Sequence, residues 1–327
     1  MEFRTTIKTA ENRGLLHHSD AVMLLGSCFS DNIGAKMQGA MMRVDVNPFG
    51  TIYNPMSIAA SVSRLIAAEP VAGMDLFEQN GVWNSYAFHS RYSLASKEAT
   101  LERMNRRIAE AHEHLRHCQV LTVTLGTAMV YRLLSTGEVV SNCHKVPQYQ
   151  FSREMATVHE VTATLTDMME RLEAFNPSLY VIFTVSPIRH IADGLEVNSL
   201  SKAVLRVAVA EVLKQVNTDP RHRRADYFPA YEIMMDDLRD YRFYAPDMIH
   251  PSEVAVEYIW QQFQAAYLDD RSAQAVARCE RVNKRLQHRP MTASADQLER
   301  FNADTQHVLR NLVKEYPYLE EVLNDKY

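Results

Sequence analysis

Three short, largely apolar runs that end at polar turns constrain the fold of this chain most strongly. Residues 21–25 and 120–125 each stop at a glycine, and residues 179–185 stop at Ser186. Runs of this length with such ends are typical of buried β-strands. Helix-forming segments lie between them, so strand, turn and helix alternate along the chain. This order predicts an α/β fold in which helices cover both faces of a central parallel sheet.

The rest of the chain supplies further elements of the same kind. We expect short strands at 3–8, 43–46 and 227–228, short strands near Trp83 and Phe88, and a hairpin of 129–134 with 138–140. Helices are predicted over residues 30–42, 56–68, 100–117, 155–175 and 199–216, and after the loop 245–253.

The chain of 327 residues is long enough for one large domain with an appendage. Residues 1–268 carry all the predicted strands, and we expect them to form the α/β domain. From about residue 270 onward the sequence is charged, rich in Arg, Glu, Gln and Leu, and without a strand pattern. Residues 269–327 are therefore predicted to form a helical C-terminal extension.

Charge and composition narrow the classes of partner and compartment. A net charge of −5 gives no basis for binding nucleic acid, and a hydrophobic content of 46% is that of a globular protein. No window approaches the roughly 18 uninterrupted apolar residues of a membrane span, so no membrane partner is expected. Residues 1–14 lack the apolar core of a signal peptide, and the four cysteines are scattered as reduced thiols would be. We therefore expect a cytoplasmic protein, whose oligomeric state the sequence does not set.

The turn after the first apolar run carries two candidate nucleophiles. Gly26 is followed by Ser27 and Cys28, and then by a segment that can form a helix. A side chain at such a turn stands at the carboxyl edge of a parallel sheet, where α/β proteins bind their ligands. The free amides at the start of the helix also favour a thiolate or a developing oxyanion.

A second stretch, Asp247-Met248-Ile249-His250, offers a general base. An Asp three residues before a His in a loop can turn back so that its carboxylate accepts the imidazole Nδ1–H. That bond would fix the tautomer and leave Nε2 free to accept a proton. The alternative is that Asp247 and His250 only cap the helix that begins near Pro251.

These two stretches resemble the GSCFA family, within the SGNH/GDSL-like hydrolase superfamily. The family signature corresponds to Gly26-Ser27-Cys28-Phe29, and the similarity covers most of residues 20–265. Six segments also carry it, namely NPFGTIYNP (47–55), NCHKVP (142–147), SPIRH (186–190), NSLSKA (198–203), YFPAYE (227–232) and DMIHPS (247–252). The resemblance implies a flavodoxin-like, three-layer α/β/α fold with a central parallel sheet.

The resemblance also implies a position for the nucleophile. In the superfamily, a Gly-Asp-Ser block places the nucleophilic serine just after the first strand, and Cys28 aligns with that serine. A cysteine at a helix start beside a histidine can attack a carbonyl without the strong base that a serine needs. Two alternatives stay open. A turn shifted by one residue makes Ser27 the nucleophile, or Cys28 is a packing residue and neither side chain reacts.

Oxyanion-hole donors are implied in the same way. The superfamily's second-block glycine corresponds to Gly50, whose backbone amide would stabilise the oxyanion; otherwise Gly50 only forms a turn. Asn54 offers a side-chain amide, or sets up the turn before Pro55. The third block, Gly-x-Asn-Asp, is not matched, because the chain has Gly126-Thr127-Ala128-Met129. Thr127 is the candidate replacement donor.

Four more residues are candidate substrate contacts. Asn142 and His144, beyond the predicted hairpin, either reach into the cleft or simply end the hairpin. Ser186 and Arg189 follow the third apolar run, at the edge where α/β ligand sites lie. Arg189 can clamp a carboxylate or phosphate with two hydrogen bonds, and a loop-stabilising role is the alternative.

Metal and nucleotide chemistry have little support in the sequence. His112, His114, His117 and Cys118 crowd one predicted helix, and His114 and Cys118 have the i, i+4 spacing of two zinc ligands. No third cluster accompanies them, so we interpret the group as a solvated helix face and expect no metal. Neither a Gly-x-Gly-x-x-Gly fingerprint nor a P-loop occurs, and no cofactor is expected.

The leading hypothesis is an SGNH-like hydrolase or acyl-transferring enzyme. Cys28 or Ser27 would attack an ester carbonyl, His250 would act as base and then as acid, and Asp247 would orient His250. The superfamily implies a small-molecule or carbohydrate ester as substrate, with O-acylated sugars as the first class to test. The alternative is a non-catalytic ligand-binding protein on the same scaffold, which the altered first and third blocks favour.

Overall fold

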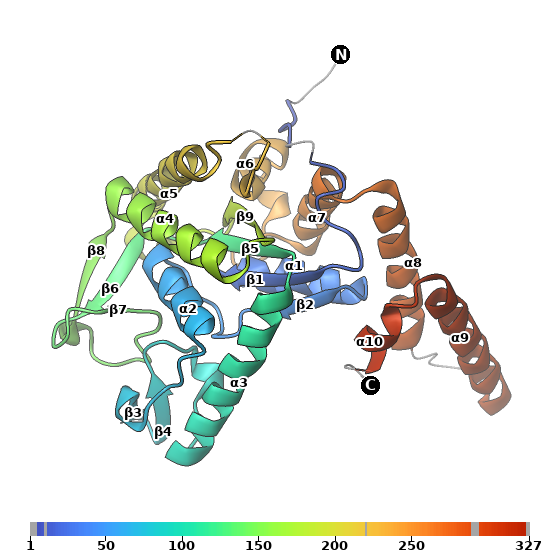
Figure 1. Ribbon diagram of the computed structural model, residues 1–327, viewed down its shortest axis with the longest axis horizontal. Helices are drawn as coiled ribbons and strands as arrows, with labels where there is room; N and C mark the ends of the chain where they lie inside the picture. The colour runs from blue at the N-terminus through green and yellow to red at the C-terminus, as the bar shows by residue number, and fades with distance from the viewer. Residues whose placement is uncertain (1–4, 10–11, 220, 289–293, 325–327) are drawn as a thin grey trace.

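A five-stranded parallel sheet forms the centre of the computed structural model, which describes residues 5–9, 12–219, 221–288 and 294–324 (Figure 1). From one edge to the other, the strands are β10 (Ala225–Phe228), β9 (Tyr180–Val185), β5 (Val120–Leu125), β1 (Ala21–Gly26) and β2 (Arg43–Val46). Numbered in chain order from the β2 edge, this is the 2-1-3-4-5 arrangement of flavodoxin-like folds. The predicted α/β fold with a central parallel sheet is confirmed.

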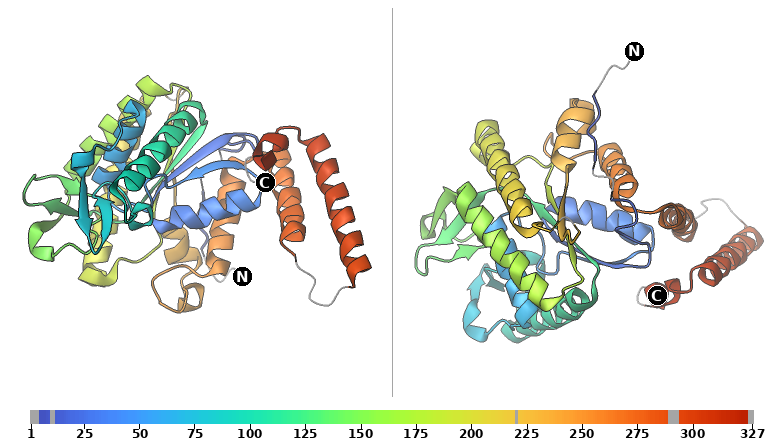
Figure 2. Two further views of the ribbon diagram at one scale, coloured as in Figure 1. Left: turned by 90° about the horizontal axis from the view of Figure 1, so that it is seen from below. Right: turned by 45° about the horizontal axis from the view of Figure 1, so that its top comes forward.

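Helices cover both faces of this sheet (Figures 1 and 2). They are α1 (Cys28–Gly39), α2 (Pro55–Ala67), α3 (Lys97–His117), α4 (Val158–Phe175), α5 (Leu195–Val216) and α7 (Glu253–Tyr267). Successive residues of a strand point to opposite faces, so the strands supply two cores. Met23 and Leu25 of β1 pack in the core that α2 to α5 cover. Val22 and Leu24 pack in the core that α1 and α7 cover.

Capping residues set the helix starts, and the starts of α1 to α5 differ from prediction by one to four residues. Ser27 caps α1, which therefore begins at Cys28 and not at residue 30. Thr157 forms a capping box with Glu160, so α4 begins at Val158 and not at residue 155. Hydrogen bonds to the first amides fix these boundaries, and apolar periodicity does not report them.

The residues just before α4 form a strand that we did not predict. β8 (Phe151–Met155) pairs with the hairpin of β6 (Met129–Leu133) and β7 (Val139–Val140), and the predicted hairpin is confirmed. A second hairpin joins β3 (Leu76–Gln79) to β4 (Val82–Ser85).

Three of the expected short strands have different outcomes. Trp83 lies in β4 as predicted, but Phe88 lies in a bend and not in a strand. The expected edge strand at 3–8 is wrong for residues 5–8, which form no strand, and residues 3–4 lie outside the described residues. Single-turn and short helices complete the described chain: Gly73–Asp75, Ser90–Tyr92, Gln148–Gln150, Ile191–Asp193, α6 (Ala230–Glu232), Ile233–Asp237 and Tyr241–Phe243.

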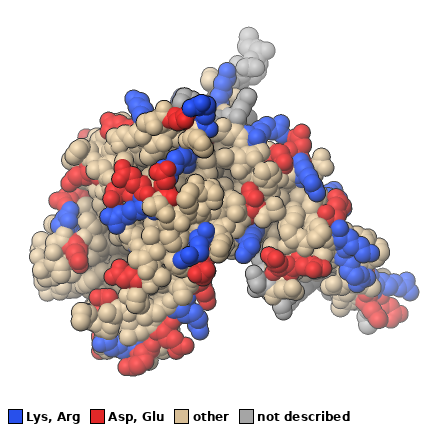
Figure 3. All heavy atoms as spheres, in the orientation of Figure 1, with Lys and Arg blue, Asp and Glu red and all other residues tan. Residues whose placement is uncertain are grey.

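The C-terminal region is helical, as predicted. It comprises α8 (Asp270–Gln287), α9 (Ala295–Glu315) and α10 (Leu319–Asn324), which lie to one side of the sheet (Figure 2). Its small core includes Cys279, Leu312 and Leu319, and Met41 from the segment before β2 joins it. Lys, Arg, Asp and Glu side chains are interspersed on the face in Figure 3, with both signs on these helices. Among the described helices, none has the length and apolarity needed to cross a membrane.

Candidate active site

The turn after β1 has a backbone that only glycine tolerates easily. Gly26 has φ +134°, and a Cβ there would overlap the main-chain oxygen of Thr124 and lie 2.8 Å from its carbonyl carbon. Ser27 follows as the N-cap of α1 and is fully buried. Its Oγ accepts the Phe29 amide at 3.3 Å and donates to Ser186 Oγ at 3.0 Å. Both Ser27 and Ser186 are therefore engaged inside the fold.

Cys28 is the first residue of α1 and is only partly buried. Its Sγ lies 3.7 Å from Nε2 of His250, across 222 positions of sequence. Burial, followed by the nearby Asp31 carboxylate, raises the pKa of the Cys28 thiol. The Cys28 amide and the Lys202 ammonium act in the opposite direction. The thiol is thus a protonated group within reach of an imidazole.

His250 is oriented by the carboxylate three residues before it. Asp247 Oδ2 accepts His250 Nδ1–H at 2.6 Å, and Oδ1 accepts the amides of Ile249 and His250 at 2.9 and 3.0 Å. These two amides, and then the imidazole, lower the pKa of Asp247 to about 2. Because Nδ1 carries the proton in this bond, the neutral ring presents a bare Nε2 to the thiol. The His250 side chain remains 44% exposed, so solvent also reaches it.

Arg189 holds the loop that carries His250. Its amide donates to Ile249 O at 3.2 Å, its Nη1 to Met248 O at 3.5 Å, and its guanidinium lies 3.9 Å from the ring centre of Tyr244. These contacts correspond to the loop-stabilising alternative, with the guanidinium stacked on an aromatic face.

The three expected oxyanion donors all form hydrogen bonds within the fold, although the bond of Asn54 uses its side-chain oxygen and not its N–H group. The Gly50 amide donates to Asn47 O at 2.8 Å within a turn at φ +86°. Asn54 caps α2 by accepting the Ser57 amide at 2.8 Å. Thr127 bonds Ser201 Oγ through its hydroxyl at 3.0 Å and donates its amide to Tyr53 O at 3.0 Å. The Gly50 amide is thus used within its own turn, which corresponds to the alternative interpretation, and both polar groups of Thr127 are bonded to distant segments of the fold.

Asn142 and His144 belong to the hairpin region. Asn142 Oδ1 accepts the His144 amide at 2.8 Å, and His144 Nε2 lies 2.8 Å from Ser85 O of β4. The His144 ring also packs against Phe77 of β3, with centroids 5.8 Å apart. These contacts correspond to the alternative in which the polar segment ends a hairpin.

Two residues at the site escaped sequence reasoning although they lie in quoted segments. Asn47 is fully buried, accepts the Gly26 amide at 2.9 Å and donates to Asp31 Oδ1 at 2.8 Å, so it joins the end of β1 to α1. Lys202 of α5 is also buried, and its Nζ donates to Gly126 O at 2.6 Å and to Ser186 O at 2.8 Å. An asparagine beside a proline normally indicates a turn. A lysine in an amphipathic helix normally indicates a position exposed to solvent.

His190 completes the surroundings of the site. Its Nε2 is buried and has no hydrogen-bond partner within the described part of the chain, and its ring meets Tyr53 edge-on at 5.3 Å. Burial, followed by the charges of Lys202 and His250, lowers the pKa of His190 to about 4. A neutral imidazole at this position adds no positive charge to the site at neutral pH.

The histidines of α3 are not a solvated face throughout, contrary to the interpretation from sequence. His114 Nε2 lies 2.9 Å from Val22 O, His112 Nδ1 lies 2.6 Å from Leu65 O, and Cys118 is fully buried. Only His117 of the four is exposed. Within the described residues, no group of three or more His, Cys, Asp or Glu side chains is placed to hold a metal ion.

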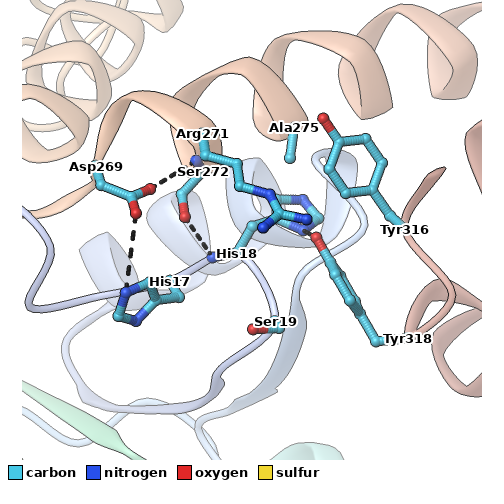
Figure 4. A pocket seen from close by; sticks show the side chains of 9 residues that line it. All are labelled: His17, His18, Ser19, Asp269, Arg271, Ser272, Ala275, Tyr316 and Tyr318. Atoms are coloured by element: carbon cyan, nitrogen blue, oxygen red, sulfur yellow. Dashed lines mark hydrogen bonds and ion pairs between the residues drawn. The ribbon is translucent and has the colours of Figure 1, made fainter.

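Two cavities lie elsewhere on the molecule, and neither is lined by Cys28 or His250. A groove of about 830 Å³ runs along α2 between the two hairpins. A cavity of about 360 Å³ lies where residues 17–19 meet the C-terminal helices (Figure 4). There His18 contacts Tyr318 Oη through Nδ1 at 2.9 Å, and its amide donates to Ser272 at 3.1 Å. These bonds fasten the start of the chain to the extension.

Several solved structures resemble this chain. A carbohydrate esterase family 3 structure from Talaromyces cellulolyticus has 11% identity and a TM-score of 0.38, over 79% of this chain and 98% of that chain. An acetyl xylan esterase from Butyrivibrio proteoclasticus has 9% identity and a TM-score of 0.39, over 76% and 63%. A family two carbohydrate esterase from Clostridium thermocellum, in complex with cellohexaose, has 14% identity and a TM-score of 0.31, over 79% and 64%. These TM-scores are below 0.5, so the likeness does not bear on the activity of this chain.

Two sequence comparisons were informative in different ways. A search of curated protein sequences finds no match. The model of the GSCFA family, in contrast, matches residues 21–263, which include both the turn with Cys28 and the loop with His250. The chain therefore belongs to the GSCFA family.

Proposed function

We propose that this protein is an SGNH-like acyl-transferring enzyme or esterase that uses Cys28 as nucleophile, His250 as base and Asp247 as the orienting carboxylate. One observation carries the proposal: Cys28 Sγ lies 3.7 Å from His250 Nε2, while His250 Nδ1 lies 2.6 Å from Asp247 Oδ2. This is the order of groups that nucleophilic acyl transfer requires. Ser27 fits the role less well, because its hydroxyl is buried and donates to Ser186.

The proposed reaction has two halves. Sγ attacks the ester carbonyl while Nε2 takes the thiol proton, and that proton then passes to the departing alcohol as the thioester forms. Water, or a second alcohol, next gives a proton to Nε2 and attacks the thioester, which releases the acid or new ester and restores the thiol. Asp247 keeps the proton on Nδ1 throughout and stabilises the imidazolium.

A base is needed because the thiol is not ionised at rest. Burial raises the pKa of Cys28, so the proton must leave during the attack and His250 is the group placed to take it. The Cys28 amide, which is the first N–H of α1 and has no acceptor within the helix, is the donor best placed for the oxyanion.

The substrate class rests on the superfamily resemblance, from which we propose an O-acylated carbohydrate or another small ester. The test is turnover of a panel of acetylated sugars and aryl acetates by the wild type, Cys28→Ala, Ser27→Ala and His250→Ala. Loss of turnover in the Cys28 and His250 variants, with turnover kept in Ser27→Ala, is expected. Equal turnover in wild type and His250→Ala would refute the proposal.

A second candidate function is ligand binding without catalysis. The observation that favours it is the engagement of the amides of Gly50 and Thr127, which leaves few donors for an oxyanion. An electrophilic thiol probe separates the two functions. Fast labelling of Cys28 in wild type and slow labelling in His250→Ala favour the enzyme, whereas similar labelling of both proteins favours a binding role.

The proposal also covers the domain boundary of the chain and the cellular compartment of the protein. We place the boundary between an α/β domain (1–268) and a helical extension (269–327) where α8 begins a separate small core. Thiols stay reduced most readily in a reducing compartment, and all four cysteines are free, which supports a cytoplasmic location.

A further inference from the structure

Lys202 is a buried lysine at the carboxyl edge of the sheet. Lys202 is only 2% exposed, and its Nζ donates to two main-chain carbonyls, Gly126 O at 2.6 Å and Ser186 O at 2.8 Å. No carboxylate among the described residues forms an ion pair with it. A buried ammonium without a counter-anion is costly, so a position that retains one calls for an explanation.

The two carbonyls place this cation at the edge of the sheet that also carries the candidate nucleophile. Gly126 and Ser186 directly follow β5 and β9, and β5 lies beside β1 in the sheet. Ser186 Oγ in turn accepts the hydroxyl of Ser27, the residue before Cys28. Lys202 thus lies at the strand ends that support the turn with the thiol.

We propose that Lys202 is the counter-cation of the Cys28 thiolate, a positioning residue that stabilises the negative charge on Sγ when the proton leaves for His250. The inference rests on the proposed function, because it gives the buried charge a partner only if Cys28 ionises. Lys202 acts through Cys28 and does not contact the substrate.

The charges around the pair support this assignment. Burial lowers the pKa of Lys202 to about 7, and the charge of Cys28 acts to raise it again; reciprocally, Lys202 lowers the pKa of Cys28. Asp31 opposes Lys202 at the thiol. His190 is kept neutral by burial and by Lys202, and the other titratable groups facing this cluster include His250, Tyr53 and Tyr231, whose ring centre lies 5.9 Å from Lys202 Nζ.

The first test is the pH profile of Cys28 alkylation by iodoacetamide, followed on the Cys28 peptide by mass spectrometry. In Lys202→Met the midpoint should rise by about one pH unit, which makes alkylation about tenfold slower below both midpoints. Lys36→Met is the matched control, because Lys36 lies on the same helix as Cys28 but pairs with Glu257 at 2.6 Å. A midpoint in folded Lys202→Met equal to that of Lys36→Met would overturn the inference.

A second test needs no substitution at Lys202, whose loss leaves two buried carbonyls without a donor. Wild-type Cys28 is converted with iodoacetate to an anionic carboxymethyl group, or with iodoacetamide to a neutral carboxamidomethyl group of the same shape. In ¹³C-lysine-labelled protein, the Cε signal of Lys202 is then followed by NMR against pH; it is recognised by its titration midpoint near 7. A midpoint at least about one unit higher beside the anion is expected, and equal midpoints would overturn the inference.

These readouts separate the inference from the proposed function. Both tests measure the coupling of two charges and require no ester substrate. Ester turnover in His250→Ala tests the proposed reaction alone. Coupling without turnover would refute the proposed reaction but keep the charge pair, and turnover without coupling would remove Lys202 from the mechanism.

Discussion

Gly26→Ala tests whether the tight approach of β1 to β5 fixes the turn that carries Cys28. A Cβ at this position would overlap the main-chain oxygen of Thr124 and lie 2.8 Å from its carbonyl carbon, at φ +134°. A side chain at positive φ costs about 1–2 kcal/mol, and added volume against a rigid backbone costs about 1–3 kcal/mol more. We therefore expect a stability loss of about 2–5 kcal/mol, a large part of the roughly 5–15 kcal/mol typical of a domain.

Gly137→Ala is the matched control, because Gly137 has φ +75° but nothing within 4 Å of the added Cβ. It should lose only the cost of the positive φ, about 1–2 kcal/mol. Urea unfolding of the three proteins, extrapolated linearly, measures both losses. Alkylation of Cys28 gives a second readout, because displacement of Gly26 also disturbs its bond to Asn47. Equal losses in the two variants would refute the reasoning that Thr124 confines the turn.

Three further substitutions test single contacts of the site. Ser27→Ala removes the cap of α1 and the bond to Ser186, so unfolding should become easier by about 1–2 kcal/mol while Cys28 alkylation stays near the wild-type rate; a lost alkylation reaction in a folded variant would contradict this. Asp31→Asn keeps the oxygen that Asn47 binds but removes the carboxylate charge that raises the pKa of Cys28, so alkylation at neutral pH should be about threefold to tenfold faster; an unchanged rate counts against the electrostatic account. Asp247 has a folded-state pKa of about 2 against an ordinary value of 3.8, so its ionised form stabilises the fold above pH 4 and this contribution disappears as the pH falls through 2. The difference between the urea midpoints of wild type and Asp247→Asn should therefore shrink between pH 5 and 2, and a constant difference would show that ionisation of Asp247 does not stabilise the fold.

The sheet was predictable because burial on both faces leaves a direct mark on the sequence. The strands that became β1, β5 and β9 are short, nearly wholly apolar and bounded by polar turns, and each was found within one residue. β8 was missed because its sequence, FSREM, mixes polar and apolar residues. The segment is a strand because it pairs with β6. Such an edge strand depends on a partner that local pattern does not reveal.

The candidate site was predictable where local sequence fixes the geometry. The short span from Asp247 to His250 lets the carboxylate meet both Nδ1 and the intervening amides. The choice between Ser27 and Cys28 depends on where α1 begins. Serine is favoured at the N-cap, where its hydroxyl bonds a helix amide, and this preference was a signal that the predicted start at residue 30 overlooked. Burial of Lys202 had no such signal, because it depends on carbonyls from two distant strands.

The charged groups around Cys28 act in opposite directions on its partly buried thiol. Burial and Asp31 favour the neutral thiol, and a protonated thiol is a poor target for oxidants. Lys202 and the first amide of α1 favour the thiolate, but their effect is smaller than that of burial. In the proposed reaction the proton therefore stays on sulfur until Nε2 of His250 receives it, and solvent reaches this imidazole because its side chain is 44% exposed. If this reaction takes place, the loop that carries His250 controls it: Arg189 bonds this loop to the end of β9, and Asp247 orients the imidazole.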